Sequence, residues 1–184
     1  MMNMMLILAL SLFPGLARQD AEVAAAAPAH VSNSFEFDVH APLTETAPLF
    51  GPEGERCWAG KHWNPVFVYP QPGKDVEGAV FTIAHGQHTV VWVNTILDVA
   101  GGRMQYVVVI PEVQTFTVDV RLSPVASAVT HVKVTYTRTA LDVSANDTVI
   151  AMGKMDGTVG PGWQRAIESY LKNGSAGACI QALK

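Results

Sequence analysis

The sequence predicts an α+β fold in which a curved antiparallel sheet of about seven strands wraps a long C-terminal helix and leaves an apolar cavity between them. Segments with alternating polar and apolar residues recur along residues 34–140, separated by short turns. A proline-rich stretch interrupts them after the first segment, and an apolar stripe with helical spacing follows the last. Short turns favour antiparallel neighbours, because parallel strands need long crossovers.

The first predicted strand covers residues 34–41, where Phe35, Phe37 and Val39 alternate with polar residues. Two short helices are predicted after it, at residues 43–49 and 52–58. The prolines at positions 42, 48 and 52 keep these helices short. Proline is tolerated in a first helical turn, because its missing N–H would be unpaired there.

Turn residues, among them Ser123-Pro124, divide the next part of the chain into short segments. Alternation places Phe116 and Val118 on the inward face of one segment and Val134 and Tyr136 on the inward face of another. A sheet with one apolar face has to cover that face. The six strands predicted here are residues 66–69, 79–84, 89–97, 104–110, 114–122 and 131–140.

The cover is predicted between residues 149 and 171, where apolar residues at helical spacing fall within one arc of roughly 120°. These residues are Val149, Met152, Met155, Val159, Trp163, Ile167 and Tyr170. Pro161 and several glycines resist a regular helix. We therefore expect one helix kinked near residues 160–162, and two separate helices are the alternative.

Composition excludes several classes of function. Of the 184 residues, 49% are hydrophobic and 15% charged, and the formal net charge is −4. This describes a globular chain with a sizeable core. No cluster of Lys and Arg is present to neutralise phosphates, so a nucleic-acid partner is not expected.

The N-terminal segment has the order of a secretory signal. Residues 4–13 are apolar, Pro14-Gly15 ends the run, and Ala17 marks a small-residue site. The run is too short for a stable transmembrane anchor, and no Lys or Arg precedes it. We expect a signal peptide at residues 1–17, an Ala-rich linker at 18–33, the folded domain at 34–171 and a flexible tail at 172–184. Location is then secreted or periplasmic, with a cytoplasmic protein and an over-extended start site as the alternative.

The two cysteines, Cys57 and Cys179, lie far apart in the sequence. They could pair after export, but spacing alone does not show that their Cα atoms approach. We favour the interpretation that both cysteines are unpaired thiols.

Two short helices after the first strand, a six-strand meander and a C-terminal helix form the helix-grip arrangement. The sequence resembles the START-like superfamily, specifically its SRPBCC or polyketide cyclase/dehydrase and lipid-transport group. The resemblance implies a helix-grip domain over roughly residues 35–171 and does not specify a ligand. The residues that carry it are 41–42, 49–56 (LFGPEGER), Trp58, 64–65, 69–70, 77–81, 91–93, Trp163, Ile167 and 170–171.

Inward aromatic residues are the candidate wall of the cavity, although ordinary core packing is the commoner fate of such residues. In a helix-grip fold the two roles overlap. Asn94 shares a strand face with Trp92 and is the candidate for orienting a polar group of a ligand. The predicted ligand-binding residues are Trp63, Phe81, Trp92, Asn94, Tyr106, Phe116, Tyr136 and Trp163.

Asp156, Tyr106 and His85 are the candidate catalytic residues. Asp156 lies on the apolar helical stripe, where burial would raise the pKa of its carboxyl and suit it to acid–base chemistry. The alternative is that Asp156 satisfies backbone or water near the helix break. His85 and His88 would need His62 to hold a metal, and turn residues are their commoner role, so neither a metal nor a cofactor is expected.

Three functions remain open. The first is binding or carriage of a small hydrophobic molecule, lipid- or polyketide-like, in the cavity. The second is a cyclase- or dehydratase-type enzyme that uses acid–base residues there. The third is a protein-interaction module that resembles a co-chaperone.

Overall fold

The computed structural model describes residues 26–86 and 88–173. The predicted leader lies outside these ranges, as do the linker up to residue 25 and the tail from residue 174. The elements are β1 (His30–Val39), α1 (Leu43–Thr46), η1 (Ala47–Phe50), α2 (Pro52–Glu55), β2 (Val66–Tyr69), β3 (Val80–His85), β4 (His88–Asp98), β5 (Arg103–Ile110), β6 (Gln114–Ala126), β7 (Val129–Ala140), η2 (Val143–Ala145), α3 (Asn146–Asp156) and α4 (Gly160–Lys172).

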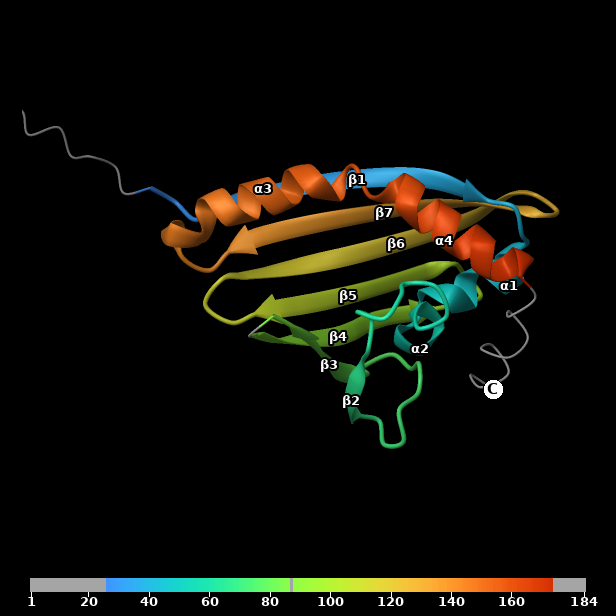
Figure 1. Cartoon of the computed structure of the whole chain (residues 1–184), viewed down its shortest axis with the longest axis horizontal. Helices are drawn as coiled ribbons and strands as arrows, with labels where there is room; N and C mark the ends of the chain where they lie inside the picture. Colours follow the sequence, from blue (N-terminus) through green and yellow to red (C-terminus); the bar gives the residue numbers. More distant parts are fainter. Residues whose placement is uncertain (1–25, 87, 174–184) are drawn as a thin grey trace, which may run out of the picture.

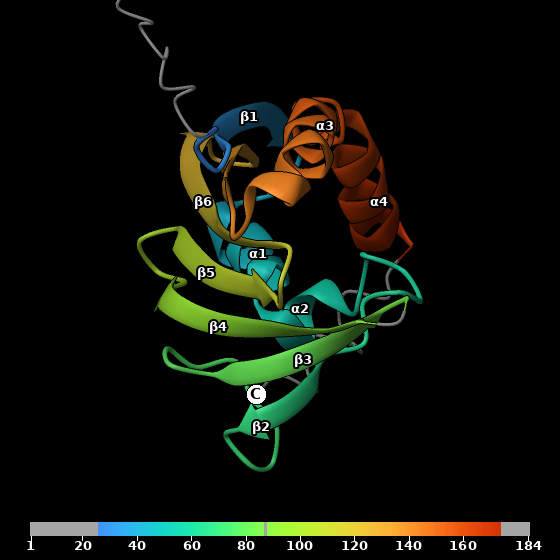
Figure 2. The same cartoon turned by 90° about the vertical axis from the view of Figure 1, so that its left-hand side faces the viewer.

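The strands form a single seven-stranded sheet in the order β1-β7-β6-β5-β4-β3-β2, and every neighbouring pair is antiparallel. The meander β2–β7 is sequential, while β1 returns beside β7 as the far edge. Figure 1 shows α3 and α4 running along β1, and Figure 2 shows the sheet curving from β1 around to β2. The predicted α+β class and helix-grip order are confirmed.

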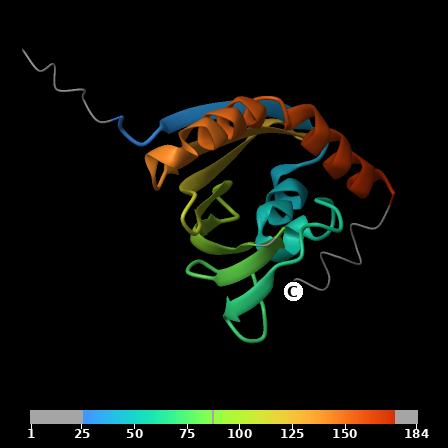
Figure 3. The same cartoon turned by 60° about the vertical axis from the view of Figure 1, so that its left-hand side comes forward.

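The short helices α1, η1 and α2 lie on the concave side of the sheet (Figure 3). Helix α1 contacts β6 and β7. Helix α2 begins at Pro52, and Asp75 accepts hydrogen bonds from the backbone N–H groups of Glu53 (2.8 Å) and Gly54 (3.3 Å). Carboxylate oxygens satisfy donors that have no partner inside the helix. The loop before β3 therefore fixes α2 against the sheet.

The C-terminal cover consists of two helices rather than one kinked helix. The break falls at residues 157–159, before the predicted kink, and Pro161 lies in the first turn of α4, where it costs no hydrogen bond. The alternative of two helices is therefore the observed one. Val149 and Ile167 of the predicted stripe are fully buried, but Met155 is 65% exposed because the buried face of α3 is formed by Val149, Gly153 and Asp156.

Two strand boundaries differ from the prediction by more than two residues. Strand β1 begins at His30, before the predicted start at residue 34, and β6 runs through Ser123-Pro124 to Ala126. Proline is compatible with β6 here because β5 pairs with β6 only as far as Arg121, so no neighbour on that side needs the missing N–H. The predicted inward faces are confirmed: Phe116, Val118 and Val134 are buried.

The interpretation of Cys57 as an unpaired thiol is wrong, since Cys57 is disulfide-bonded. Sequence spacing does not show which sulfur atoms approach in the fold, so this pairing was not predictable from it. Cys179 lies outside the described residues. Within the described ranges, no helix is long and apolar enough to cross a membrane.

Candidate functional site

A cavity of about 520 Å³ lies between the concave face of the sheet and helices α2, α3 and α4. Its volume is in the range that holds a drug-sized ligand. The exposed residues His62 and His85 form part of its wall, so the cavity reaches the surface beside them. The wall consists of Glu55, Trp58, Ala59, His62, Trp63, Ile83, His85, Val90, Trp92, Tyr106, Ile110, Gln114, Phe116, Val118, Val120, Tyr136, Arg138, Met152, Gly162, Trp163 and Ala166.

Most of the predicted ligand-binding aromatics line this cavity. Trp63 and Trp92 meet edge to face with ring centroids 5.2 Å apart, and Phe116 and Tyr136 lie 6.1 Å apart. Phe81 does not line it: this ring is fully buried behind Trp92, stacked at 5.9 Å. The sheet alternates strictly, so inward residues of neighbouring strands form one aromatic wall.

Asn94 is fully buried but is not part of the cavity wall. It lies at the irregularity in the pairing of β4 with β5. In the amide orientation that satisfies both carbonyls, its nitrogen donates to Ile96 O at 2.7 Å and Gln105 O at 3.1 Å. The Asn94 side chain therefore satisfies backbone carbonyl groups at the bulge between β4 and β5, and it does not reach the cavity.

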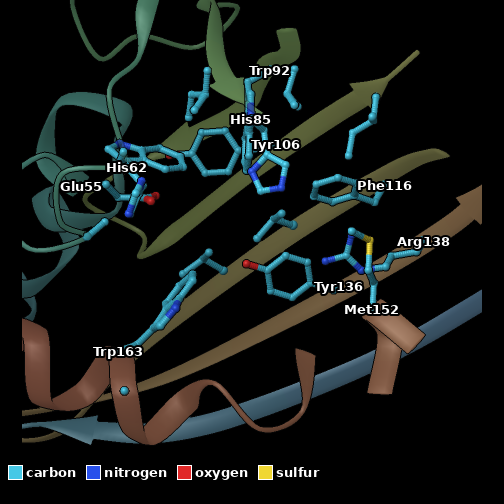
Figure 4. Close-up of a pocket in the computed structure, with 18 of the residues that line it drawn as sticks. Glu55, His62, His85, Trp92, Tyr106, Phe116, Tyr136, Arg138, Met152 and Trp163 are labelled. Atoms are coloured by element: carbon cyan, nitrogen blue, oxygen red, sulfur yellow. The ribbon is translucent and has the colours of Figure 1, made fainter. Parts of the chain in front are cut away.

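The two tyrosines have different environments. The Tyr106 hydroxyl donates a hydrogen bond to the Phe50 carbonyl. The Tyr136 hydroxyl makes no hydrogen bond to a described residue and points into the cavity in Figure 4. Burial raises the pKa of both hydroxyls, and the negative charge of Glu55 raises them further. Both therefore act as neutral hydrogen-bonding groups near neutral pH.

Asp156 is buried, as its position on the stripe predicts, but its carboxylate is held by Arg138. Arg138 Nε donates to Asp156 Oδ2 at 2.6 Å and its Nη2 donates to Oδ1 at 2.7 Å. The guanidinium also donates to Gln114 Oε1 at 3.3 Å and lies 4.4 Å from the centre of the Phe116 ring. Arg138 and Gln114 line the cavity and Asp156 does not.

His85 lines the cavity at the end of β3, and His62 lines it from the segment after α2. His88 pairs with His85 across the β3–β4 turn. No group of three or more metal-ligating side chains is found among residues 26–86 and 88–173.

Glu55 is the feature of this site that the sequence did not reveal. Its side chain projects from the end of α2 into the cavity (Figure 4), and the residue is 5% exposed. The carboxyl makes no hydrogen bond or ion pair with any described residue. Burial, and then the nearby charge of Asp75, raise the pKa of Glu55 well above its ordinary value. Such a group is a candidate for direct contact with a ligand.

One indole donor beside the cavity is unsatisfied. Trp58 Nε1 donates to Leu49 O at 2.7 Å, and Trp63 Nε1 donates to Pro52 O at 2.8 Å. Trp92 Nε1 is buried and has no hydrogen-bond partner in the part of the chain that the structure describes. Buried polar groups are nearly always paired in native proteins, so this indole N–H is an exception.

Some of the missed wall residues had a signal in the sequence. Arg138 lies two residues after Tyr136, and Gln114 lies two residues before Phe116. Alternation along each strand therefore places both on the inward face. An inward arginine opposite an aspartate on the helix stripe is a natural partner for it. Glu55 had no such signal, because nothing in the segment Pro52–Glu55 distinguishes it from Glu53.

Scans against protein-family models and against curated proteins give no match. Solved structures do match. Ara h 8.0201 is 18% identical over 79% of this chain and 99% of its own, with a TM-score of 0.58. Norcoclaurine synthase from Thalictrum flavum is 11% identical over 92% of this chain and 99% of its own, also at 0.58. An uncharacterised protein from Rhizobium leguminosarum is 14% identical, covering 80% and 97%, at 0.55.

This is the helix-grip fold of Bet v1-like proteins. The neighbours share this fold. At these identities the likeness shows the Bet v1-like fold alone. The fold accommodates cavities, and one solved structure is of norcoclaurine synthase in complex with dopamine and hydroxybenzaldehyde, at 12% identity and a TM-score of 0.58.

Proposed function

We propose that this protein binds a small, largely apolar molecule in the cavity between its sheet and its helices. The observation that carries the proposal is a cavity of about 520 Å³ walled mainly by aromatic and aliphatic side chains. Walls of rigid rings suit a compact ring system, as in a polyketide, better than a long flexible acyl chain. A few polar groups, led by Glu55 and the Tyr136 hydroxyl, orient that molecule.

The test uses a built-in reporter, because all four tryptophans of the chain line the cavity. A neutral apolar dye, N-phenyl-1-naphthylamine, should quench tryptophan emission as it binds and brighten in the dry site. Native mass spectrometry of mildly purified protein should show a bound small molecule.

A matched pair of variants localises the binding. Ala166→Phe fills space inside the cavity from α4, whereas Ala151→Phe adds the same ring to the exposed face of α3. The first should weaken dye binding at least tenfold and the second should leave it unchanged. Equal dye binding by Ala166→Phe and wild type would contradict the proposal.

Acid–base catalysis in the same cavity is the second candidate, and the buried carboxyl of Glu55 favours it. Of the residues expected from sequence to act this way, Tyr106 and His85 line the cavity and Asp156 is ion-paired behind it. Mass spectrometry of the recovered ligand before and after incubation would show conversion by wild type but not by Glu55→Gln. A ligand returned unchanged by wild type would leave binding as the function.

We also propose that the protein is exported. The leader-like residues 4–13 and the disulfide at Cys57 support this, because disulfides persist in oxidising compartments. Cell fractionation with N-terminal sequencing checks it, and a cytosolic protein that keeps residue 1 would contradict it. The protein-interaction module stays a prediction.

A further inference from the structure

Glu55 is the one carboxylic acid among the described residues that line the cavity. The other strongly charged wall residue, Arg138, is neutralised by the bidentate contact with Asp156. Among the described wall residues, Glu55 is therefore the one acid that has no counterion. A buried carboxylate of this kind is stable only beside a cation or in its protonated form.

Among the described residues, no cation pairs with Glu55. The charge of Asp75, from the loop before β3, raises the pKa of Glu55, and the charge of Glu55 in turn raises the pKa of Tyr106 on β5 and of Tyr136 on β7. His62 lines the same cavity but forms no ion pair with Glu55, and Arg56, next in sequence, donates instead to Glu53 and Asn64. The two carboxyls Glu55 and Asp75 make this end of the cavity electronegative.

Aromatic faces surround the same space. Trp58 and Trp163 meet with ring centroids 5.1 Å apart, and Trp63 and Trp92 at 5.2 Å. The faces of indole rings carry negative partial charge and attract organic cations, more strongly where water is excluded. An unneutralised carboxyl among indole rings therefore matches a cationic group on an apolar body better than an uncharged one.

We propose that Glu55 anchors a ligand that carries a protonated amine on an apolar body, which deepens and rests on the proposed binding function. The ammonium contacts the Glu55 carboxylate, and the apolar body lies against Trp92, Phe116 and Trp163. The Tyr136 hydroxyl, which Figure 4 shows pointing into the space that Glu55 also faces, accepts a further hydrogen bond from the amine. Burial raises the pKa of Glu55 in the free protein, and pairing with a cation favours the carboxylate, so binding of the amine is linked to proton release.

The experiment compares three probes of equal length that differ in charge: 3-phenyl-1-propylamine, 3-phenyl-1-propanol and 3-phenylpropionate. Calorimetry at pH 7 should give the amine at least tenfold tighter binding than the alcohol and leave the carboxylate weakest. The heat measured in phosphate and in Tris should differ by the ionisation heat of about one proton per amine bound. Affinity for the amine should rise with pH until Glu55 ionises in the free protein.

Two variants test whether the preference for the amine and the proton release come from Glu55. Glu55→Gln should remove the tenfold preference and the proton release while leaving alcohol binding intact. Glu53→Gln is the matched control, since Glu53 lies on the same helix but pairs with Arg56 at 2.9 Å, and it should behave as wild type. Thermal melts should show Glu55→Gln at least as stable as wild type at pH 8, because it removes a desolvated acid.

The outcomes separate the two proposals. Equal affinities for amine and alcohol, or an undiminished preference in Glu55→Gln, would overturn the anchor. Binding of N-phenyl-1-naphthylamine without binding of the amine would also overturn it and leave the apolar cavity standing. Failure of both the dye and all three probes to bind would overturn the binding function itself.

Discussion

The buried pair between Arg138 and Asp156 holds α3 to β7, and replacing Asp156 with Asn tests that role. The two side chains are 10% and 9% exposed and make contacts of 2.6 and 2.7 Å. Removing one charge from a buried pair costs about 3–5 kcal/mol, because the other is left unneutralised in a dry environment. Asn keeps the volume and one acceptor, so we expect a loss near the lower limit, about 3 kcal/mol.

The loss is measurable by thermal unfolding. For a domain of this size about 1 kcal/mol corresponds to 2–4 °C, so Asp156→Asn should lower Tm by roughly 6–12 °C. Glu36→Gln is the control, since Glu36 pairs with Lys133 at 2.7 Å with both side chains 47% exposed. Its Tm should stay close to that of wild type, because exposed pairs contribute little.

A second variant separates an ion pair from simple packing. Replacing both members, with Arg138→Met and Asp156→Leu together, removes the buried charges without leaving one alone. The double variant should recover most of the stability lost in Asp156→Asn, since apolar replacements of buried pairs are often neutral or stabilising. A Tm for Asp156→Asn within about 2 °C of wild type would refute the reasoning, because Arg138 would then have another counterion.

Two further predictions concern the loop and helix that carry Glu55. Burial, and to a smaller extent the charge of Glu53, raise the pKa of Asp75 from 3.8 to about 6, against the lowering effect of its backbone hydrogen bonds. The folded state then holds this proton more tightly than the unfolded state, so stability is lost as pH rises from about 4 to 6. Asp75→Asn should remove that slope, measured by urea unfolding between pH 4 and 8, although Asn can accept only one of the two backbone hydrogen bonds from α2. A difference from wild type that does not vary with pH would contradict this. A Cβ at Gly54 would lie 2.0 Å from the Pro48 carbonyl oxygen, whereas one at Gly162 meets nothing within 4 Å. Gly54→Ala should therefore lose about 1–3 kcal/mol or more, and Gly162→Ala in α4 should gain up to about 1 kcal/mol, both by thermal melts. Equal effects of the two substitutions would show that backbone contact at Gly54 is unimportant.

Much of the fold was predictable because its signals are local. Alternating polar and apolar residues over residues 34–140 predicted all seven strands, and the short turns between them predicted antiparallel pairing. The predictions were wrong at positions where packing against another strand or helix overrides the local conformational preference of the residue. Pro124 continues β6 because the pairing of β6 with β5 does not extend beyond Arg121. Met155 is exposed because the buried face of α3 is formed by Val149, Gly153 and Asp156. Helix and strand propensities predict structure poorly where tertiary contacts determine the conformation.

The candidate site was only partly predictable. Aromatic residues on inward strand faces line the cavity as expected, because parity is a local property. Asn94 and Phe81 have the right parity and do not line it, since a bulge and a second ring lie between them and the empty space. Parity indicates which face a side chain takes, and it does not indicate how deep behind that face the cavity begins.

Glu55 shows why the chemistry of the site was the least predictable part. Its neighbour Glu53 has the same charge, lies on the same short helix and is paired with Arg56. What distinguishes Glu55 is the set of elements around it. Trp63 and Trp92 line the same cavity, β5 and β7 supply Tyr106 and Tyr136, and Asp75 adds a second negative charge. These come from positions scattered along the chain, and only their assembly removes water from the carboxyl. Because desolvation is the main cause of the raised pKa of Glu55, its chemistry belongs to the folded cavity and not to the segment of sequence that carries it.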